Sequence, residues 1–242
     1  MTTEPEYSGY LQWKGWAATH FGSFGRQEAR YFAQEIENSG IKNLAQQRVV
    51  ELGFGNGSFA AWATSQAANY AGIELQPELV EFGQHAGFEM YPAQTPLPEI
   101  FPENSVDCIV AFDVFEHIEI QQLAILLEQC ARILRKDGIV VGRIPSGDSP
   151  FSGAIQHGDV THRSVLGTSA LRQLAAGAGL RVEDVREPAF PLSGAGPATF
   201  FRRITVLTLR KMTNLFIAHV LMGNSGAVLT PNLVFTMRKS SQ

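Results

Sequence analysis

Cysteine is scarce in this chain of 242 residues, which contains only Cys108 and Cys130. Cys108 lies in an apolar run with the pattern of a strand, and Cys130 lies in a leucine-rich segment with the pattern of a helix. Both are expected to be buried as small hydrophobic side chains in a reducing compartment. This scarcity excludes a disulfide scaffold, and the spacing of the cysteine, histidine and acidic residues predicts no metal site.

Basic residues are too few and too dispersed for a nucleic-acid-binding surface. The chain has 19 Lys and Arg against 23 Asp and Glu, a formal net charge of −4, and no basic run longer than a pair. Binding to duplex nucleic acid depends on neutralising many phosphates, so we expect no nucleic-acid partner.

Long apolar runs are absent as well. No stretch approaches the roughly 18 consecutive apolar residues of a membrane-spanning helix. Residues 1–6 are acidic and lack the apolar region of a secretion signal. We therefore expect a cytoplasmic protein without a transmembrane segment.

Hydrophobic periodicity predicts alternating strands and helices in a single domain, residues 1–242. A composition of 45% hydrophobic residues suffices for one well-buried core. This alternation is typical of an α/β fold with helices on both faces of a parallel sheet. The predicted strands are 48–52, 70–74, 88–91, 106–112, 138–144 and 180–185, and the predicted helices are 58–68, 78–86, 120–135 and 168–178, with Thr168 as the N-cap of the last.

The segment from Val49 to Gly57 has the pattern of a strand that leads into a nucleotide-binding turn. Its apolar strand is followed by Gly53, Gly55 and Gly57. Glycine lets the backbone approach a ligand closely and lets the turn open the next helix. The glycines alone do not identify the ligand, because the frame Gly55 to Ala60 also fits a loose dinucleotide-binding fingerprint.

Two further motifs distinguish a dinucleotide from other nucleotide cofactors. Glu74 ends the second predicted strand, and Asp113-Val114-Phe115-Glu116-His117-Ile118 follows the fourth. Together with Glu51 and the glycines, these motifs make residues 45–187 resemble the class I S-adenosylmethionine-dependent methyltransferases. The resemblance implies S-adenosylmethionine as the cofactor and a Rossmann-like, seven-stranded, mostly parallel sheet with helices on both faces. It also implies that residues 232–238 form an antiparallel final strand beside the edge of that sheet.

The resemblance also implies which residues hold the cofactor. Glu74 is expected to accept hydrogen bonds from both ribose hydroxyls, and Glu51 is expected to favour the cationic part of the ligand. Backbone atoms near Ala93 and Gln94 are expected to contact the edge of the adenine ring. These residues lie in a proline-rich loop that is expected to contain no helix. The full set of expected cofactor contacts is Glu51, Gly53, Gly55, Gly57, Glu74, Leu75, Ala93, Gln94, Asp113 and His117.

The run after the fourth strand is expected to serve both cofactor and acceptor. Asp113 and His117 are placed by the resemblance beside the methionine portion of the cofactor. Glu116 has two interpretations, one as part of this site and one as a charge at the N-terminus of the next helix, where the helix dipole favours an acid.

Polar residues cluster after the fifth predicted strand, in Arg143 to Asp148 and in Gln156 to Arg163. The run from Asp159 to His162 resembles an Asp-Pro-Thr-His stretch of methyltransferases that modify bacterial surface glycans, with valine at the proline position. A hydroxyl acceptor requires a base as the C–O bond forms. We predict that His162 is this base with Asp159 as its orienting partner, and that His157 is the alternative.

The leading interpretation is methyl transfer to a hydroxyl of a glycan or another small molecule. The alternatives are a quinone-like aromatic acceptor, a non-catalytic S-adenosylmethionine-binding protein, and a nicotinamide-dependent oxidoreductase, which would leave Asp113 to Ile118 unexplained.

Residues 1–44 and 188–242 are expected to add a helical lid and a C-terminal helix with final strands around the core at residues 45–187. The amphipathic stretch from Phe200 to Met212 fits either a core or dimer helix, which leaves a homodimer open, or a contact with acceptor or membrane surface.

Overall fold

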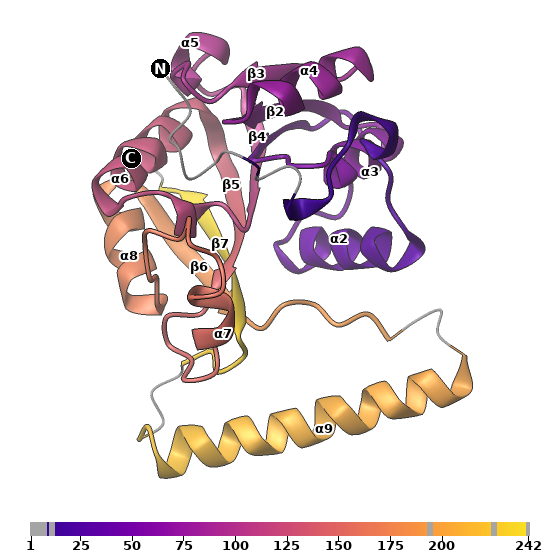
Figure 1. Cartoon of the computed structure of the whole chain (residues 1–242). Coiled ribbons are helices and arrows are strands. Elements are labelled where there is room, and N and C mark those ends of the chain that lie inside the picture. The colour runs from indigo at the N-terminus through magenta and orange to yellow at the C-terminus, as the bar shows by residue number, and fades with distance from the viewer. Residues whose placement is uncertain (1–8, 10–12, 193–195, 224–226, 241–242) are drawn as a thin grey trace.

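A computed structural model describes residues 9, 13–192, 196–223 and 227–240 (Figure 1). The acidic residues 1–6 lie outside the described residues. Seven strands form one sheet in the order β3-β2-β1-β4-β5-β7-β6, and β7 runs antiparallel to both of its neighbours while the other pairs are parallel. This architecture confirms the predicted fold class. The strands are β1 (Arg48–Leu52), β2 (Asn69–Glu74), β3 (Met90–Pro92), β4 (Val106–Phe112), β5 (Leu134–Pro145), β6 (Leu180–Arg186) and β7 (Asn232–Lys239).

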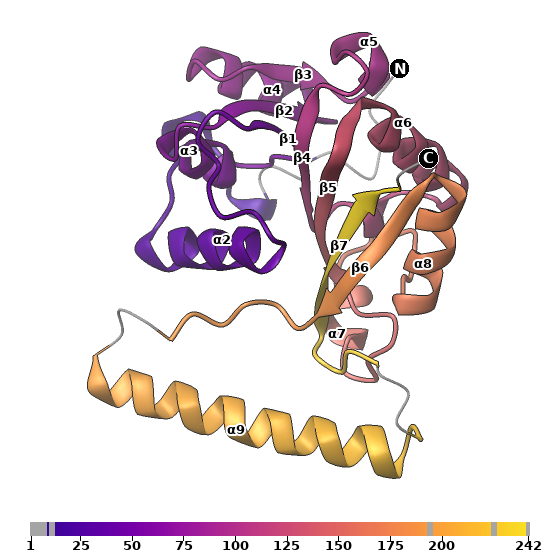
Figure 2. The same ribbon diagram turned by 180° about the vertical axis from the view of Figure 1, so that it is seen from behind.

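Helices cover both faces of the sheet (Figures 1 and 2). Side chains alternate along β1, so Val49 joins a hydrophobic cluster with Phe59 on one face, while Val50 joins a second cluster with Leu127 on the other. The first cluster takes side chains from α2 (Arg26–Asn38), α3 (Ser58–Ser65) and α4 (Pro77–His85), and the second from α5 (Leu97–Ile100), α6 (Ile120–Ile133) and α8 (Thr168–Gly177). Short helical turns η2 (Ala18–His20), η3 (Phe115–His117) and α7 (Gly153–Gln156) lie in the connections.

Three local predictions were wrong. The helix predicted to reach Arg135 ends at Ile133, because Leu134 already begins β5. The proline-rich loop contains the helical turn α5, since proline is tolerated in a first turn, where its missing N–H would have no intrahelical partner. Thr168 is not an N-cap: Gly167 occupies that position, and Asp148 accepts hydrogen bonds from the backbone N–H and the hydroxyl of Thr168.

The long helix α9 (Pro197–Val220) contradicts the core interpretation of the amphipathic stretch. Its apolar side chains are exposed, with Phe201 at 67% and Met212 at 64%. Figures 1 and 2 show α9 as a rod below the sheet, apart from the helices that cover its faces. None of the helices in the described part of the chain is both long and apolar enough to traverse a bilayer.

Candidate active site

The turn after β1 is built from glycines that no other residue could replace without strain. Gly53 has a φ of +65° and Gly55 a φ of +53°, in the left-handed region. A Cβ on Gly53 would lie 2.6 Å from Cγ2 of Val114, and a Cβ on Gly55 would lie 2.8 Å from the ring of Trp16. The turn therefore brings its backbone close to the segment after β4 and to the N-terminal segment, and Gly57 caps the start of α3.

Glu74 at the end of β2 closes this turn. Its Oε1 accepts hydrogen bonds from the backbone N–H of Leu75 (2.7 Å) and of Gln76 (3.1 Å), and its Oε2 accepts one from Gly55 (3.1 Å). A carboxylate has about four lone-pair sites, so one site on Oε2 stays open for a ligand. Burial raises the pKa of Glu74, and the three N–H donors oppose that rise.

Glu51 lies beside Glu74 as a second buried carboxyl. Its Oε2 accepts a hydrogen bond from the hydroxyl of Tyr70 at 2.6 Å. Burial raises the pKa of Glu51 to about 8, which the hydrogen bond from Tyr70 opposes and the charge of Glu74 supports. A cationic ligand group nearby would favour the ionised form of this carboxyl.

Asp113 follows β4 with a left-handed φ of +58° and forms a bidentate ion pair with Arg143 of β5. The guanidinium carbon of Arg143 lies 5.3 Å from the ring centre of Tyr31 on α2. Arg143 and Tyr31 were not predicted as site residues. The signal for the arginine was its place as the one charged residue in the apolar part of β5, residues 138–145, where it lies opposite Phe112 of β4.

A relay of hydrogen bonds connects Asp159 to His117. The Thr161 hydroxyl donates to Oδ1 of Asp159 at 2.6 Å, and Nδ1 of His117 lies 2.8 Å from the same hydroxyl. Burial, and then the nearby His162, lower the pKa of His117. The expected pairing of Asp159 with His162 is not present in the described structure. The Asp159 carboxylate instead accepts hydrogen bonds from the backbone N–H and the hydroxyl of Thr161.

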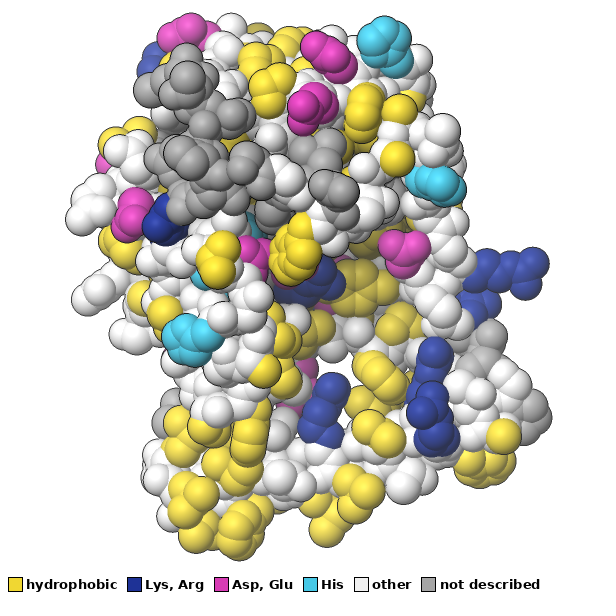
Figure 3. Space-filling model, viewed as in Figure 1, with side chains coloured by type: hydrophobic (Ala, Val, Ile, Leu, Met, Phe, Trp, Pro, Cys, Tyr) yellow, Lys and Arg dark blue, Asp and Glu magenta, His cyan; other side chains and the backbone are white. Residues whose placement is uncertain are grey.

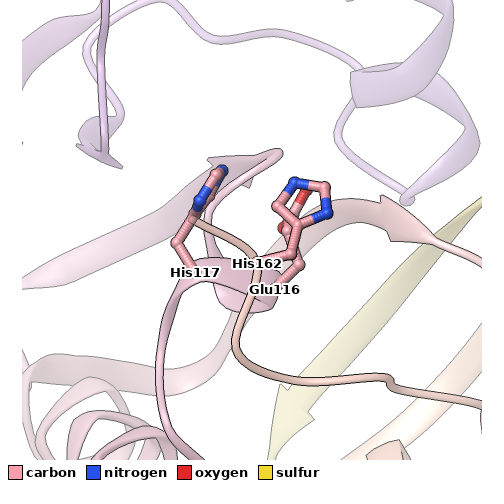
Figure 4. A group of neighbouring side chains, drawn as sticks. All are labelled: Glu116, His117 and His162. Carbon is pink, nitrogen blue, oxygen red and sulfur yellow. The ribbon is translucent and has the colours of Figure 1, made fainter. Parts of the chain in front are cut away.

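His162 is held by a different partner. Its Nδ1 lies 2.9 Å from the backbone carbonyl oxygen of Gln156, and its ring centre lies 4.7 Å from that of His117. Glu116 is almost fully buried in η3, and the N-cap of α6 is Glu119, so the interpretation of Glu116 as a charge at the N-terminus of the next helix is wrong. Burial, and then the charge of Asp113, raise the pKa of Glu116 to about 8. Figure 4 shows the three side chains gathered at η3.

These groups line one cavity of about 900 Å³ at the carboxyl ends of the strands. Trp13, Trp16 and Tyr31 add aromatic walls to the same cavity. Of the predicted site residues, Gly57 and His157 do not line it, and His157 is exposed. Those that do are Glu51, Gly53, Gly55, Glu74, Leu75, Ala93, Gln94, Asp113, His117, Asp159 and His162.

Comparison with known proteins identifies the family. The model of a family described as a methyltransferase domain matches residues 24–185. The chain belongs to this methyltransferase family. It is an S-adenosylmethionine-dependent methyltransferase, and S-adenosylmethionine is its cofactor. A search of curated proteins finds no match.

Solved methyltransferases share the fold of this methyltransferase at low identity. One from Archaeoglobus fulgidus is 15% identical with a TM-score of 0.61, over 89% of this chain and 95% of that one. One from Mesorhizobium loti is 15% identical with a TM-score of 0.56, over 85% and 97%. The 1,6-didemethyltoxoflavin-N1-methyltransferase of Burkholderia thailandensis, solved with S-adenosylhomocysteine, is 17% identical with a TM-score of 0.56, over 98% and 84%.

The residues of the methyltransferase fit its cofactor. Glu74 keeps an acceptor site for a ribose hydroxyl, and the glycines add no side chains of their own where Trp16 and Val114 approach the turn. Glu51 offers a carboxyl whose ionised form suits a cationic ligand group. Ala93 borders the same cavity and donates its backbone N–H to the carbonyl of Glu74 at 2.9 Å, which connects the proline-rich loop to the end of β2.

Proposed function

We propose that this methyltransferase methylates a hydroxyl of a glycan or another small molecule bound beside His117 and His162. β2, which ends at Glu74, and β4, which precedes η3, are separated only by β1. Two strand spacings correspond to about 10 Å. The cavity therefore extends from the cofactor residues to the histidines, and an acceptor has room next to the cofactor.

The observation that carries the proposal is a pair of imidazoles that line the cavity and are each tethered through Nδ1. When bound, the cofactor supplies the methyl group for transfer. A hydroxyl has a high pKa, so its proton must be removed as the new C–O bond forms. Because Nδ1 is occupied on both rings, Nε2 of His162 or of His117 is the atom that can accept this proton. His162 stays the predicted base, and the relay from Asp159 positions His117 beside it.

The aromatic side chains that line the cavity can pack against either a glycan or an aromatic acceptor. Trp13 and Trp16 offer flat apolar faces, against which either a sugar ring or an aromatic metabolite can stack. The walls alone do not separate these acceptors, and the histidines favour one that carries an ionisable hydroxyl.

The test is transfer of labelled methyl from S-adenosylmethionine to fractionated extract, with nucleotide sugars, lipid-linked glycans, small aromatics and proteins separated afterwards. We expect label in a glycan or small-molecule fraction. His162→Ala is expected to abolish this label while S-adenosylhomocysteine still binds, and His157→Ala, outside the cavity, serves as the matched control. Label confined to protein, or full turnover by His162→Ala, would refute the proposal.

A further inference from the structure

Glu116, His117 and His162 offer a group of ligand atoms that the spacing of these residues along the chain did not predict. One carboxylate or imidazole atom from each residue lies within 4.8 Å of the others. Glu116 is 2% exposed, and its Oε2 has no hydrogen-bond partner among the described residues. A buried carboxylate oxygen without a donor is costly unless a ligand completes it.

The hydrogen bonds of the two histidines fix where their lone pairs lie. The carbonyl oxygen of Gln156 only accepts, so Nδ1 of His162 must carry the proton and donate it. The hydroxyl of Thr161 gives its hydrogen to Asp159, so it accepts from Nδ1 of His117. In the neutral imidazoles Nε2 then holds the free lone pair on both rings. The group therefore combines two nitrogen acceptors with one buried carboxyl, whose ionised form a bound cation would favour.

We propose that Glu116, His117 and His162 bind a divalent transition-metal ion of the Zn²⁺ type. Two imidazoles and one carboxylate are a set of ligands typical of catalytic zinc, with further positions open to a substrate. Imidazole nitrogen favours zinc and similar ions over Mg²⁺, which prefers oxygen. The tethers of the two Nδ1 atoms to a carbonyl and to a hydroxyl are the outer contacts that orient histidine ligands of metals.

The geometry requires only a small adjustment. Zinc binds these ligands at about 2.0–2.2 Å, so ligand atoms of one ion lie roughly 3.3 Å apart. Closing the observed separation of up to 4.8 Å asks each side chain to move by about 1 Å. All three residues line the cavity, so the open positions of the ion face the acceptor space.

The ion has a chemical role that rests on the proposed function. An acceptor hydroxyl that coordinates the ion ionises more readily and releases its proton to water. The resulting oxyanion takes the methyl group as the S–CH₃ bond breaks, which leaves an ether and the neutral thioether of S-adenosylhomocysteine. In this form of the site the histidines hold the metal, and the metal replaces the imidazole as the group that activates the hydroxyl.

The test measures metal binding directly, without cofactor or acceptor. Full-length protein is stripped with a chelator and titrated with Zn²⁺ by calorimetry, and with Co²⁺ by its visible absorption. We expect one ion per chain. Glu116→Gln and His162→Gln should each weaken Zn²⁺ binding at least tenfold, whereas His157→Gln, an exposed neighbour, should leave it unchanged. Binding of S-adenosylhomocysteine shows that each variant is folded.

The outcomes of this titration test the metal site independently of the proposed methyl transfer. Failure of the stripped wild-type protein to bind Zn²⁺ or Co²⁺ on titration, or binding that persists in both variants, would overturn the metal site even if glycans are methylated. A stoichiometric ion that both variants lose would support the site even if no hydroxyl acceptor is found. If one variant fails to bind S-adenosylhomocysteine, the other variant decides the result.

A second inference comes from the orientation of α9, which presents its polar side to the protein. Arg203 donates to the backbone carbonyl of Pro191 at 2.6 Å, Arg210 pairs with Glu187 at 2.9 Å, and Asn214 donates to the same glutamate at 2.7 Å. Contacts of this kind usually lie on the solvent side of a helix, so α9 has the reverse of the common arrangement.

The outward side of α9 is apolar and flanked by basic residues. Phe201, Met212 and Phe216 are each more than 60% exposed, and a rotation of 100° per residue places them on one side of the helix. The same rotation places Arg202 and Lys211 roughly 90° to either side of that face. Figure 3 shows hydrophobic side chains along the outer edge of α9 and Lys or Arg side chains between the helix and the body.

We infer that this face of α9 lies on an anionic lipid surface. Arg202 and Lys211 border this face and the helix contains no acidic residue, whereas the whole chain has a net charge of −4. An apolar face with basic residues at its borders is the arrangement of helices that rest at the boundary of headgroups and acyl chains. A second copy of α9 would bring like charges together, because the face carries no acid to pair with Arg202 or Lys211.

The test is flotation with vesicles of phosphatidylcholine alone and with added phosphatidylglycerol. We expect binding to the anionic vesicles that falls with salt, and a loss of at least tenfold in the double variant Met212→Ser and Phe216→Ser. Val165→Ser, at a position 58% exposed outside α9, is the matched control. No binding, equal binding to both vesicles, or a stable dimer that the double variant dissociates would overturn the inference.

Discussion

Replacement of Glu74 by Gln tests the cofactor site most directly. In the structure one lone-pair site on Oε2 stays open after three backbone N–H groups are satisfied. A hydrogen bond to a charged group contributes about 1.5–3 kcal/mol. At about 1.4 kcal/mol for each factor of ten, Glu74→Gln should weaken binding of S-adenosylhomocysteine about 10- to 150-fold.

The substitution also disturbs the turn, and the assay must separate the two effects. A glutamine offers one acceptor oxygen, and its amide group would face at least one backbone N–H of Gly55, Leu75 or Gln76. Calorimetry should therefore compare S-adenosylhomocysteine with an analogue that lacks the ribose hydroxyls, in wild type and variant. Glu78→Gln, on the exposed first turn of α4, is the control. If the variant loses the same factor for both ligands, the ribose contact is refuted and the loss belongs to the turn.

Three further predictions concern backbone space and buried charge. Gly53→Ala places a Cβ 2.6 Å from Val114 at positive φ, so urea unfolding should show a loss of about 1–3 kcal/mol and calorimetry a loss of cofactor affinity, which Val114→Ala restores only in part. Glu51→Gln should flatten the pH dependence of unfolding. Burial raises the pKa of Glu51 to about 8, so its contribution to stability is present below its ordinary pKa and is lost by up to about 1.4 kcal/mol per pH unit as pH rises toward 8. Gly142→Ala places a Cβ 2.1 Å from the ring of Phe235, so thermal unfolding should show a loss of several kcal/mol, part of which Phe235→Leu recovers.

The sheet could be predicted because its inner strands are short runs of consecutive apolar residues. Val49 and Val50 are both apolar since each faces a different helical layer, as a parallel sheet requires. The end of α6 could not be predicted in the same way. Leu134 continues the spacing of Leu127 and Cys130, so periodicity extends the helix, but the buried side chain of Leu134 belongs to β5. Only the pairing of Val106 with Leu134 in the sheet decides between the two.

The residues proposed for the cofactor could be predicted from the sequence better than those proposed for the acceptor. The cofactor residues follow from backbone geometry, because glycines at positive φ and an acid at a strand end are local features. The acceptor residues depend on contacts between distant segments. His117 meets Thr161 across 44 positions and Asp113 meets Arg143 across 30, and no local spacing encodes either pair. For the same reason the sequence predicted no metal site, while the fold brings His162 beside Glu116.

Three residues that depart from local rules, Glu51, Asp113 and Glu116, line the same cavity, and this supports an active site there independently of the family. Asp113 adopts a left-handed φ that costs a non-glycine residue about 1 kcal/mol or more. Glu51 and Glu116 are buried carboxyls, each with a pKa raised to about 8. A fold selected for stability alone would place such groups in solvent or pair them. Their position around one space fits a site that binds cations, as we propose for the sulfonium of the cofactor near Glu51 and for the metal ion at Glu116.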